Sequence, residues 1–345
     1  MLIKRRLSNL FLMIGIMLAL NSAFAFDADP LPSWNDGAAK KAILNFVAKT
    51  KEEGPSYVPP AERIVVFDND GTLWPEQPMY VQLAFAIDRI KKLAPKHPEW
   101  KNTQPFKAVI EGDLEGLKKI GTKGVVELIM TSHAGMSAED FDKIVKEWIA
   151  TARHPRFNLP YTRLAYQPML ELLRYLRANS FKTFIVSGGG VEFIRPWAEK
   201  TYGIPPEQVV GSSIKLKYED NNNKPEIIRL SEINFIDDGA GKPVGIQMYI
   251  GRRPIAAFGN SDGDVKMLEW TTSGNKQGLG ILVHHDDEKR EWAYDRQSDI
   301  GKLDKGLNEA QKRGWTVVSM KNDWRKVFSF EDKQQDINAT GNDGQ

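Results

Sequence analysis

The chain has 345 residues, of which 41% are hydrophobic, no cysteine, and 47 basic side chains against 45 acidic ones, for a formal net charge of +2. This length and apolar content allow one large domain or two modest ones with a substantial core, and they indicate a globular protein. The charge balance excludes a strongly basic protein, so nucleic acid is not a favoured partner. Without cysteine, the fold must be stabilised by core packing alone.

The first 25 residues have the pattern of a secretory signal peptide. The basic cluster "KRR" precedes the apolar run "LFLMIGIMLAL", which is followed by the small-residue pattern "AFA". Cleavage after Ala25 leaves 44 basic against 45 acidic residues, a net charge of −1. No later segment approaches the roughly 18 uncharged apolar residues of a membrane span. We therefore expect an exported bacterial protein, periplasmic or secreted, that no membrane holds after cleavage.

Residues 26–60 combine a helical stretch, "GAAKKAILNFVAKT", with the Pro- and Gly-containing "EEGPSYVPP", and we interpret them as a lead-in to the first strand. Strand-like runs then alternate with helical patterns over residues 61–75 and 166–330. The runs are "IVVF", "KTFIVSGG", "EQVVGSSIKL", "PIAAFGNS", "LGILVHH" and "WTVVSM". This alternation predicts an α/β fold with a Rossmann-like, doubly wound, mostly parallel sheet and helices on both of its faces.

Residues 76–165 interrupt the alternation, because they contain no convincing strand over a stretch far longer than the usual loop of about 2–6 residues. We predict that they form an inserted helical cap domain. Its clearest helix runs through "SAEDFDKIVKEWIA", where Ser137 is positioned to cap and apolar residues recur at helical spacing. The tail, residues 331–345, lacks apolar content and is predicted to be disordered.

Two carboxylates directly follow the first strand. Asp68 and Asp70 stand one residue apart, and Gly71 and Thr72 follow at once where the backbone has to turn. Because residues i and i+2 of an extended segment point to the same side, both carboxylates face one small volume. A cation or a shared proton must relieve their repulsion. An acidic turn with Thr72 as a helix cap is the alternative interpretation.

Two further strand ends carry groups suited to an anion and a metal. Ser187 follows a strand, with Gly188 and Gly189 before a helix, which predicts a phosphate site made of a hydroxyl and backbone N–H groups. The stretch "GNSDGD", residues 259–264, follows another strand and offers oxygen ligands that suit Mg²⁺. Lys242, upstream of it, is a candidate to pair with a nucleophile and a phosphate.

These motifs, in this order, resemble the haloacid dehalogenase superfamily in its phosphatase branch, over about residues 61–75 and 166–285. The resemblance implies that Asp68 attacks phosphorus and forms an aspartyl-phosphate. It implies that Asp70 protonates the leaving group and then activates water. Lys242 is the best match for the cation of the site, and these three residues are the expected catalytic groups.

The resemblance also assigns the remaining site residues. Ser187 matches the hydroxyl that holds the transferring phosphoryl group, and the expected partners in phosphate binding are Thr72, Gly188 and Gly189. The expected cofactor is Mg²⁺, with ligands Asp68, Asp70, Asn260 and Asp264. The loop "VSGGG" resembles that of phosphoserine phosphatases, but it indicates phosphate binding rather than specificity for phosphoserine.

Asn260 departs from the family pattern, in which most phosphatases have a metal-binding Asp after this glycine. An amide oxygen still binds Mg²⁺, but with one less negative charge. We therefore expect weaker metal binding than in members with Asp at this position. Asp264 matches the second acid of the motif, and Asp262 is an alternative source of the missing charge.

The resemblance implies a Mg²⁺-dependent phosphomonoester hydrolase for a small phosphorylated metabolite, with the helical insertion as a cap that closes over the site. Two alternatives stay open. One is phosphotransfer to an alcohol acceptor, and the other is a binding protein of this fold whose catalysis Asn260 has impaired. The sequence predicts neither the substrate nor the oligomeric state.

Several residues near these motifs are weaker candidates. Glu76 and Gln77 follow the nucleophile loop and are positioned to reach a substrate amine or hydroxyl. Arg195, in the helix after the glycine turn, is more often a surface residue, and Lys266 is a poorer match to the catalytic cation than Lys242. The run "HHDD", residues 284–287, resembles a metal cluster, but a solvated strand end at the rim of the pocket is the favoured interpretation.

Overall fold

The structure, a computed structural model, describes residues 29–119, 121–220, 223–274 and 278–331. The predicted signal peptide and residues 332–345 of the predicted disordered tail lie outside the described residues. In the described part of the chain, no helix is long and apolar enough to cross a bilayer.

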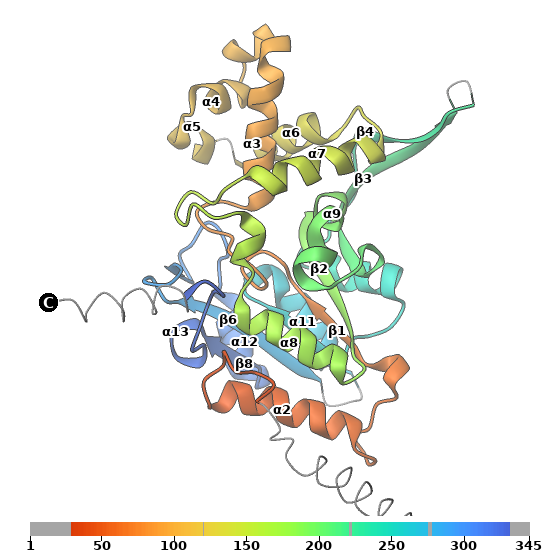
Figure 1. The fold of residues 1–345 in the computed structure, drawn as a ribbon, viewed down its shortest axis with the longest axis vertical. Helices are drawn as coiled ribbons and strands as arrows, with labels where there is room; N and C mark the ends of the chain where they lie inside the picture. Colours follow the sequence, from red (N-terminus) through yellow and green to blue (C-terminus); the bar gives the residue numbers. More distant parts are fainter. Residues whose placement is uncertain (1–28, 120, 221–222, 275–277, 332–345) are drawn as a thin grey trace, which may run out of the picture.

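An eight-stranded sheet forms the centre of the molecule (Figure 1). Its strands lie in the order β4-β3-β2-β1-β5-β6-β7, and β8 pairs with β6. All pairs are parallel except β3 with β4 and β6 with β7. The predicted α/β fold with a mostly parallel sheet is confirmed. The strands are β1 (Ile64–Phe67), β2 (Lys182–Gly190), β3 (Val209–Asp220), β4 (Pro225–Phe235), β5 (Ala256–Gly259), β6 (Leu279–Asp286), β7 (Ala293–Tyr294) and β8 (Thr316–Ser319).

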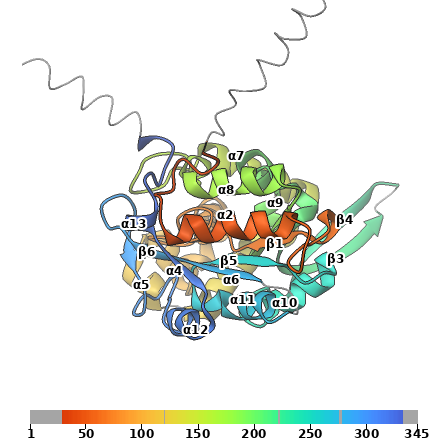
Figure 2. The same cartoon turned by 90° about the horizontal axis from the view of Figure 1, so that it is seen from below.

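Helices cover both faces of this sheet (Figure 2). Because successive residues of a strand point to opposite faces, β1 divides its side chains between two buried clusters. Val65 and Phe67 join the larger cluster, and Ile64 and Val66 join the smaller one. The helices over the larger cluster are α2 (Ala38–Lys51), α8 (Gln167–Ala178) and α9 (Val191–Tyr202), and those over the smaller one are α10 (Gly241–Gly245), α11 (Val265–Thr272) and α12 (Lys305–Arg313).

The N-terminal segment that the sequence presents as a lead-in is packed into the core. Ile43 and Val47 of α2 are buried in the larger cluster, together with Trp34 just before the helix. Trp34 meets Trp324, near the short helix α13 (Met320–Asp323), edge to face at 5.9 Å between ring centroids. The first and last described segments of the chain therefore pack against each other in the larger cluster, on one face of the sheet.

The segment 76–165 is helical, and among its described residues it contributes no strand to the sheet. Its helices lie together above the sheet in the view of Figure 1. They have a buried cluster of their own, in which Trp100 and Phe106 stack at 4.5 Å between ring centroids. At the start of α7, the Ser137 hydroxyl accepts the N–H of Asp140, which is the cap that the sequence indicated. The helices are α3 (Val81–Leu93), α4 (Phe106–Glu111), α5 (Leu114–Lys119), α6 (Gly121–His133) and α7 (Ala138–Thr151).

A long hairpin of β3 and β4 connects this helical cap to the sheet (Figure 1). The strand-like runs identified from the sequence did not include β4, whose side chains are mostly exposed or half-buried. Arg229 of β4 pairs by its backbone with the loop between α6 and α7, donating to Met136 O at 2.9 Å and accepting from Gly135 N at 2.8 Å. The cap is therefore held by the β3–β4 hairpin as well as by its two chain connections to the core.

Candidate active site

Three predicted site residues lie at the carboxyl ends of neighbouring parallel strands. Asp68 follows β1, Ser187 ends the regular part of β2, and Asn260 follows β5. Since β1 lies between β2 and β5, these side chains meet at one edge of the sheet. In open α/β sheets this edge is the usual position of a ligand site.

Lys242 binds directly to the predicted nucleophile. Its Nζ donates to Asp68 Oδ1 at 2.6 Å, to Asp264 Oδ1 at 2.7 Å and to Val186 O at 2.9 Å. Burial by itself would lower the pKa of Lys242, but the carboxylates of Asp264 and Asp68 outweigh it and raise that pKa above its ordinary value. Lys242 is therefore a fixed cation, and its three acceptors hold its ammonium group in one place.

Burial raises the pKa of Asp68 well above its ordinary value, and the neighbouring Asp264 adds to this, while the ammonium of Lys242 opposes it. The side chain of Asp68 is almost fully buried but lines a cavity. Lys242 occupies one of its two oxygens, and a carboxylate has about four acceptor sites. Asp68 thus keeps acceptor capacity toward the cavity.

Asp264 holds the loop after β5 in place. Its Oδ2 accepts from the backbone N–H of Asn260 at 2.9 Å and of Ser261 at 3.1 Å, and from the Ser261 hydroxyl at 3.2 Å. Lys242 donates to Oδ1, so three of the four donors share Oδ2. Asp264 positions Lys242 and the loop in this structure, and it does not line the cavity.

Asp70 also lines the cavity, on the same side as Asp68. Its Oδ1 accepts the indole N–H of Trp74 at 2.8 Å. Burial raises the pKa of Asp70, against the opposing effect of its hydrogen bonds from Trp74 and Asn69. A carboxyl group with a raised pKa keeps a proton closer to neutral pH, which suits a group that must protonate a leaving alcohol.

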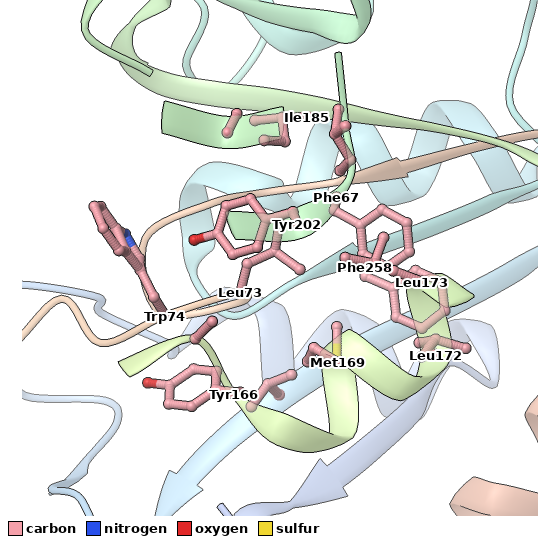
Figure 3. Close-up of a cluster of buried hydrophobic side chains, with 14 of the residues drawn as sticks. Phe67, Leu73, Trp74, Tyr166, Met169, Leu172, Leu173, Ile185, Tyr202 and Phe258 are labelled. Atoms are coloured by element: carbon pink, nitrogen blue, oxygen red, sulfur yellow. The ribbon is translucent and has the colours of Figure 1, made fainter. Parts of the chain in front are cut away.

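The loop that carries both acids is held from behind. Gly71 has φ +76°, and a side chain there would lie 2.1 Å from Asn260 Nδ2, so both its conformation and its space require glycine. His285 Nε2 lies 2.7 Å from Gly71 O, and its Nδ1 lies 3.0 Å from Glu291 Oε2. Behind these, Phe67 stacks on Phe258 at 4.6 Å within a buried apolar cluster (Figure 3). The nucleophile loop is thus rigid.

Asn260 is part of a chain of four hydrogen-bonded side chains next to the acids. Its Oδ1 accepts the Thr72 hydroxyl at 2.9 Å, and its Nδ2 donates to Glu76 Oε1 at 2.7 Å. Glu76 Oε1 also accepts the hydroxyl of Tyr294 at 2.8 Å. Burial raises the pKa of Glu76 well above its ordinary value, as do the nearby Asp70 and Asp68. In place of the acid that the family usually has at residue 260, the site has an amide bound to a separate carboxyl group.

The predicted phosphate loop lies at the end of β2. The pairing of β2 with β3 shifts register between Ser187 and Gly190, which takes Gly188 and Gly189 out of the ladder. The Ser187 hydroxyl accepts Gly189 N–H at 3.1 Å, so its own proton can be donated to an anion. The N–H of Gly190, at the start of α9, donates to Gln82 Oε1 of the cap at 2.7 Å. Of the two expected cradle amides, that of Gly189 is therefore already hydrogen-bonded to a side chain, as is the neighbouring amide of Gly190.

A cavity of about 360 Å³ lies between this edge of the sheet and the cap. We call Asp68, Asp70, Ser187 and Lys242, which line one side, the catalytic floor. The opposite side is formed by α3, α6 and the β3–β4 hairpin. The structure thus brings Asp68, Asp70, Lys242, Ser187, Gly188 and Gly189 to one cavity beneath the cap, whereas Thr72, Asn260 and Asp264 lie outside its lining.

The donors at the floor fit Mg²⁺. Asp68 and Asp70 face the cavity, and Asn260 Oδ1 has one donor, Thr72, where a carbonyl oxygen accepts two. Within the described residues, no group of three or more His, Cys, Asp or Glu is arranged to hold a metal ion. Mg²⁺ commonly uses only one or two carboxylates and completes its shell with water and substrate phosphate. Two carboxylates and an amide oxygen satisfy that requirement.

Of the weaker candidates, Glu76 lines the cavity, whereas Gln77, Arg195 and Lys266 do not. Arg195 donates to the carbonyls of Pro206 and Val209, and Gln77 to that of Ile300. Asp262, the alternative source of charge, accepts the N–H groups of Asp304 and Gly306 beside α12.

Of the run 284–287, His285 supports the nucleophile loop, and the two acids are bound elsewhere. Asp286 binds Ser319, and Asp287 binds Arg290. These residues form structural contacts rather than a metal site or a pocket rim.

Sequence reasoning did not identify Gln82, His133 and Arg229 as cavity residues. They lie on the cap and on β4, far along the chain from the motifs. Only the folding of the cap and the hairpin brings them to the site, so no local pattern marks them.

A family model for haloacid dehalogenase-like hydrolases matches residues 65–269, and the chain belongs to this family. The identification made from the motifs is confirmed. The catalytic floor lies within or beside the matched residues, and the cap is inserted between its first two motifs.

Comparison with solved structures gives matches of low sequence identity, of which the first has a similar fold. A conserved protein of unknown function from Anaerococcus prevotii DSM 20548 has 17% identity and a TM-score of 0.51, with 81% of this chain and 91% of that chain covered. A protein of unknown function from Bordetella pertussis Tohama I has 16% identity and a TM-score of 0.46, with coverage of 74% and 98%. A phosphoserine phosphohydrolase-like protein from Francisella tularensis subsp. tularensis SCHU S4 has 17% identity and a TM-score of 0.39, with coverage of 76% and 95%. No curated protein sequence matches the chain significantly.

Proposed function

We propose that the protein hydrolyses phosphomonoesters of small molecules through a phosphoryl group carried on Asp68. The observation that carries this proposal is the contact of 2.6 Å between Asp68 and the buried cation Lys242 at the floor of the cavity. A second acid, Asp70, and the hydroxyl of Ser187 line the same floor. A nucleophile, a fixed cation, an acid and an anion-binding loop are the parts that phosphoryl transfer requires.

The proposed reaction has two steps. In the first, an oxygen of Asp68 forms a bond to phosphorus, the bond from phosphorus to the ester oxygen breaks, and Asp70 gives its proton to the departing alkoxide. In the second, Asp70 takes a proton from water, the water oxygen bonds to phosphorus, and the bond to Asp68 breaks. The products are an alcohol and inorganic phosphate, and Asp68 and Asp70 return to their starting states.

Charge neutralisation is the main task of the floor, because a carboxylate and a phosphate dianion repel each other. Lys242 supplies a permanent positive charge, and Ser187 supplies a donor whose orientation Gly189 fixes. Mg²⁺ held by Asp68, Asp70 and Asn260 would neutralise charge on the phosphoryl oxygens. Asp264 acts through Lys242 and the loop, as a positioning residue.

We further propose that this reaction takes place outside the cytoplasm, in the periplasm or the medium. The support is the leader pattern of residues 1–25. The absence of cysteine is compatible with an oxidising compartment, because the chain has no thiol that could be oxidised there.

The test is phosphate release from an aryl phosphate by the purified protein, with Mg²⁺ and with a chelator, beside Asp68→Asn. The proposal predicts Mg²⁺-dependent turnover that this substitution abolishes. Full activity of Asp68→Asn would exclude it as the nucleophile. Transfer of the phosphoryl group to an added alcohol would instead show that the acceptor need not be water.

A further inference from the structure

The side of the cavity opposite the catalytic floor is apolar. Four half-buried side chains of α6, at positions that recur on one face of a helix, point into the cavity: Val125, Val126, Ile129 and Met130. Ile214 of β3 and Ile233 of β4 line it as well. We call these six residues the apolar roof.

The roof face of α6 is distinct from the face by which the helix is held in the cap. Leu128 points away from the cavity lining into the buried cluster of the cap, where it is fully buried with Ile90 and Val109. Five of the roof residues are only half-buried and Ile233 is exposed, although all six are as apolar as Leu128. The cavity therefore has a partly exposed apolar wall. Covering such a surface with an apolar group is favourable.

The polar side chains next to the roof are bound to one another. Arg229 pairs with Glu192, donates from Nε to His133 O at 2.7 Å, and lies 3.9 Å above the ring of Phe141. Its side chain is only 3% exposed. A substrate carboxylate would have to break these contacts in order to use this cation, and burying a charge without a partner is costly.

Gln82 and His133 also have their hydrogen-bond partners within the protein. Gln82 accepts from Gly190 N–H, and its Nε2 lies 3.1 Å from His133 Nε2. The other ring nitrogen of His133 lies 2.7 Å from the Ser132 hydroxyl. Glu76 and Asp238, the other acids of the lining besides the two catalytic ones and Glu192, belong to the loops at the strand ends, and not to the roof.

We propose that the phosphomonoesters taken by this site carry a small apolar organic group, such as an aryl ring or a short alkyl chain, which the roof covers. As a statement about substrates, this rests on the proposed function. The cavity of about 360 Å³ is near the lower limit of the roughly 300–1,000 Å³ that ligand pockets span. After the phosphate occupies the floor, the remaining space suits a group of limited size.

Three phosphonates with six carbon atoms each test the roof without requiring turnover: hexylphosphonate, ω-aminohexylphosphonate and ω-carboxypentylphosphonate. They place the same anion on the floor and a methyl, ammonium or carboxylate at the far end. Calorimetry on the purified protein with Mg²⁺ should give a Kd for hexylphosphonate about 10- to 100-fold lower than for either charged analogue. Equal affinities, or tighter binding of the ammonium compound, would overturn the inference.

The corresponding phosphate esters separate this inference from the proposed function. All three release a primary alcohol, so differences in kcat/KM report binding of the organic group rather than leaving-group chemistry. We expect the hexyl ester to have the highest kcat/KM. Selective binding of hexylphosphonate without hydrolysis of any ester would contradict the proposed function alone, whereas hydrolysis that favours a charged ester would contradict the apolar roof alone.

A matched pair of variants locates the effect. Ile129→Thr introduces a hydroxyl into the roof, and Ile110→Thr makes the same change in the cap cluster, away from the cavity. The first should lower the preference for hexylphosphonate by about tenfold, and the second should leave it unchanged. Val126→Thr, which keeps side-chain volume, serves if Ile129→Thr does not fold. An equal loss of preference in roof and control variants would contradict the assignment.

Discussion

The catalytic floor and the apolar roof face the same cavity but are built in opposite ways. Each floor side chain follows or supports a strand end and is held by hydrogen bonds, as Lys242 is by Asp68 and Asp264. The roof side chains come from an inserted helix and a hairpin, and their surroundings are apolar. The difference separates two tasks: the floor supplies charge for chemistry, and the roof supplies surface for selection.

The two sides also differ in how they are connected. Floor residues are linked through the sheet, whose central strands are buried on both faces. The cap meets the core through polar contacts, such as Gln82 with Gly190, and through apolar packing, since Phe85 of α3 lies in the same buried cluster as Phe193 of α9. A change in the floor should therefore affect chemistry and global stability together, whereas a change in the roof should affect selection or local stability.

The largest expected effect is on the floor. Lys242→Met removes the cation between two buried carboxylates and should lower the free energy of unfolding by about 3–5 kcal/mol. The kcat/KM for an aryl phosphate should fall by at least about 100-fold, because a charge that stabilises the transition state is lost. Lys266→Met, at an exposed lysine of α11, is the control and should change neither quantity. Denaturant unfolding measures the stability, and initial rates measure kcat/KM. A Lys242→Met variant that is stable and active would contradict the role of Lys242 as the cation of the site.

The next effect concerns the pairing of Asn260 with Glu76. Asn260→Asp places two carboxyl groups at the 2.7 Å separation of the present hydrogen bond, so they repel unless one binds a proton. We expect a loss of about 1–3 kcal/mol in the free energy of unfolding, larger at higher pH. The double variant Glu76→Gln with Asn260→Asp should recover most of it, because the amide then donates to the acid.

The stabilisation by Mg²⁺ is a second measurement on these two variants. Stabilisation of the double variant by Mg²⁺, followed as a shift in Tm, should be at least as large as that of the unaltered protein, since a carboxylate then occupies residue 260. If Asn260→Asp alone were as stable as the unaltered protein at every pH, the carboxyl group of Glu76 would not explain why residue 260 is an amide.

A smaller effect is expected in the cap, and it depends on pH. Burial lowers the pKa of His133 to about 3 from an ordinary value of 6.5, and the nearby Arg229 adds to this. As the pH falls below 6.5, the unfolded chain binds a proton that the folded protein does not, so stability decreases by up to about 1.4 kcal/mol per pH unit. His133→Gln should flatten this slope between about pH 6.5 and pH 5.

His97→Gln is the matched control for that experiment, because His97 is an exposed histidine of the same cap. Its slope of unfolding free energy against pH should equal that of the unaltered protein. An unchanged slope in His133→Gln would show that other groups cause the acid sensitivity.

The smallest effect is expected at the start of α7. Ser137→Ala removes the hydroxyl that accepts the N–H of Asp140, and it should cost about 1 kcal/mol in the free energy of unfolding. Since Ser137 does not line the cavity, the relative Kd values of the three phosphonates should stay the same. A changed preference would mean that the roof is sensitive to the stability of the whole cap.

The sequence was sufficient to predict the floor, because its chemistry depends on short motifs at strand ends. Asp68, Ser187 and Asn260 each follow an apolar strand, and parallel strands place their carboxyl ends at one edge. Lys242 was found from its distance to the last motif, although no local pattern surrounds it. The α/β fold followed from the alternation of strand-like and helical runs.

The sequence did not predict the roof or the partners of the floor. β4 was missed because its side chains do not alternate cleanly between a buried and an exposed face. The contacts of Glu76 with Asn260 and of His285 with Gly71 span 184 and 214 residues, so no spacing rule reveals them. Thr72 is a phosphate ligand in the motif analysis, but in the structure its hydroxyl donates to Asn260.

The central claim is that Asp68 carries the phosphoryl group, and the most direct measurement is to trap it there. The protein is mixed with an aryl phosphate and Mg²⁺, quenched in acid within one turnover, digested and analysed by mass spectrometry. The account predicts one added phosphoryl group on the peptide that contains Asp68, and none in Asp68→Asn. Rapid phosphate release without any modified Asp68 peptide would contradict it, and so would a phosphoryl group found on Ser187.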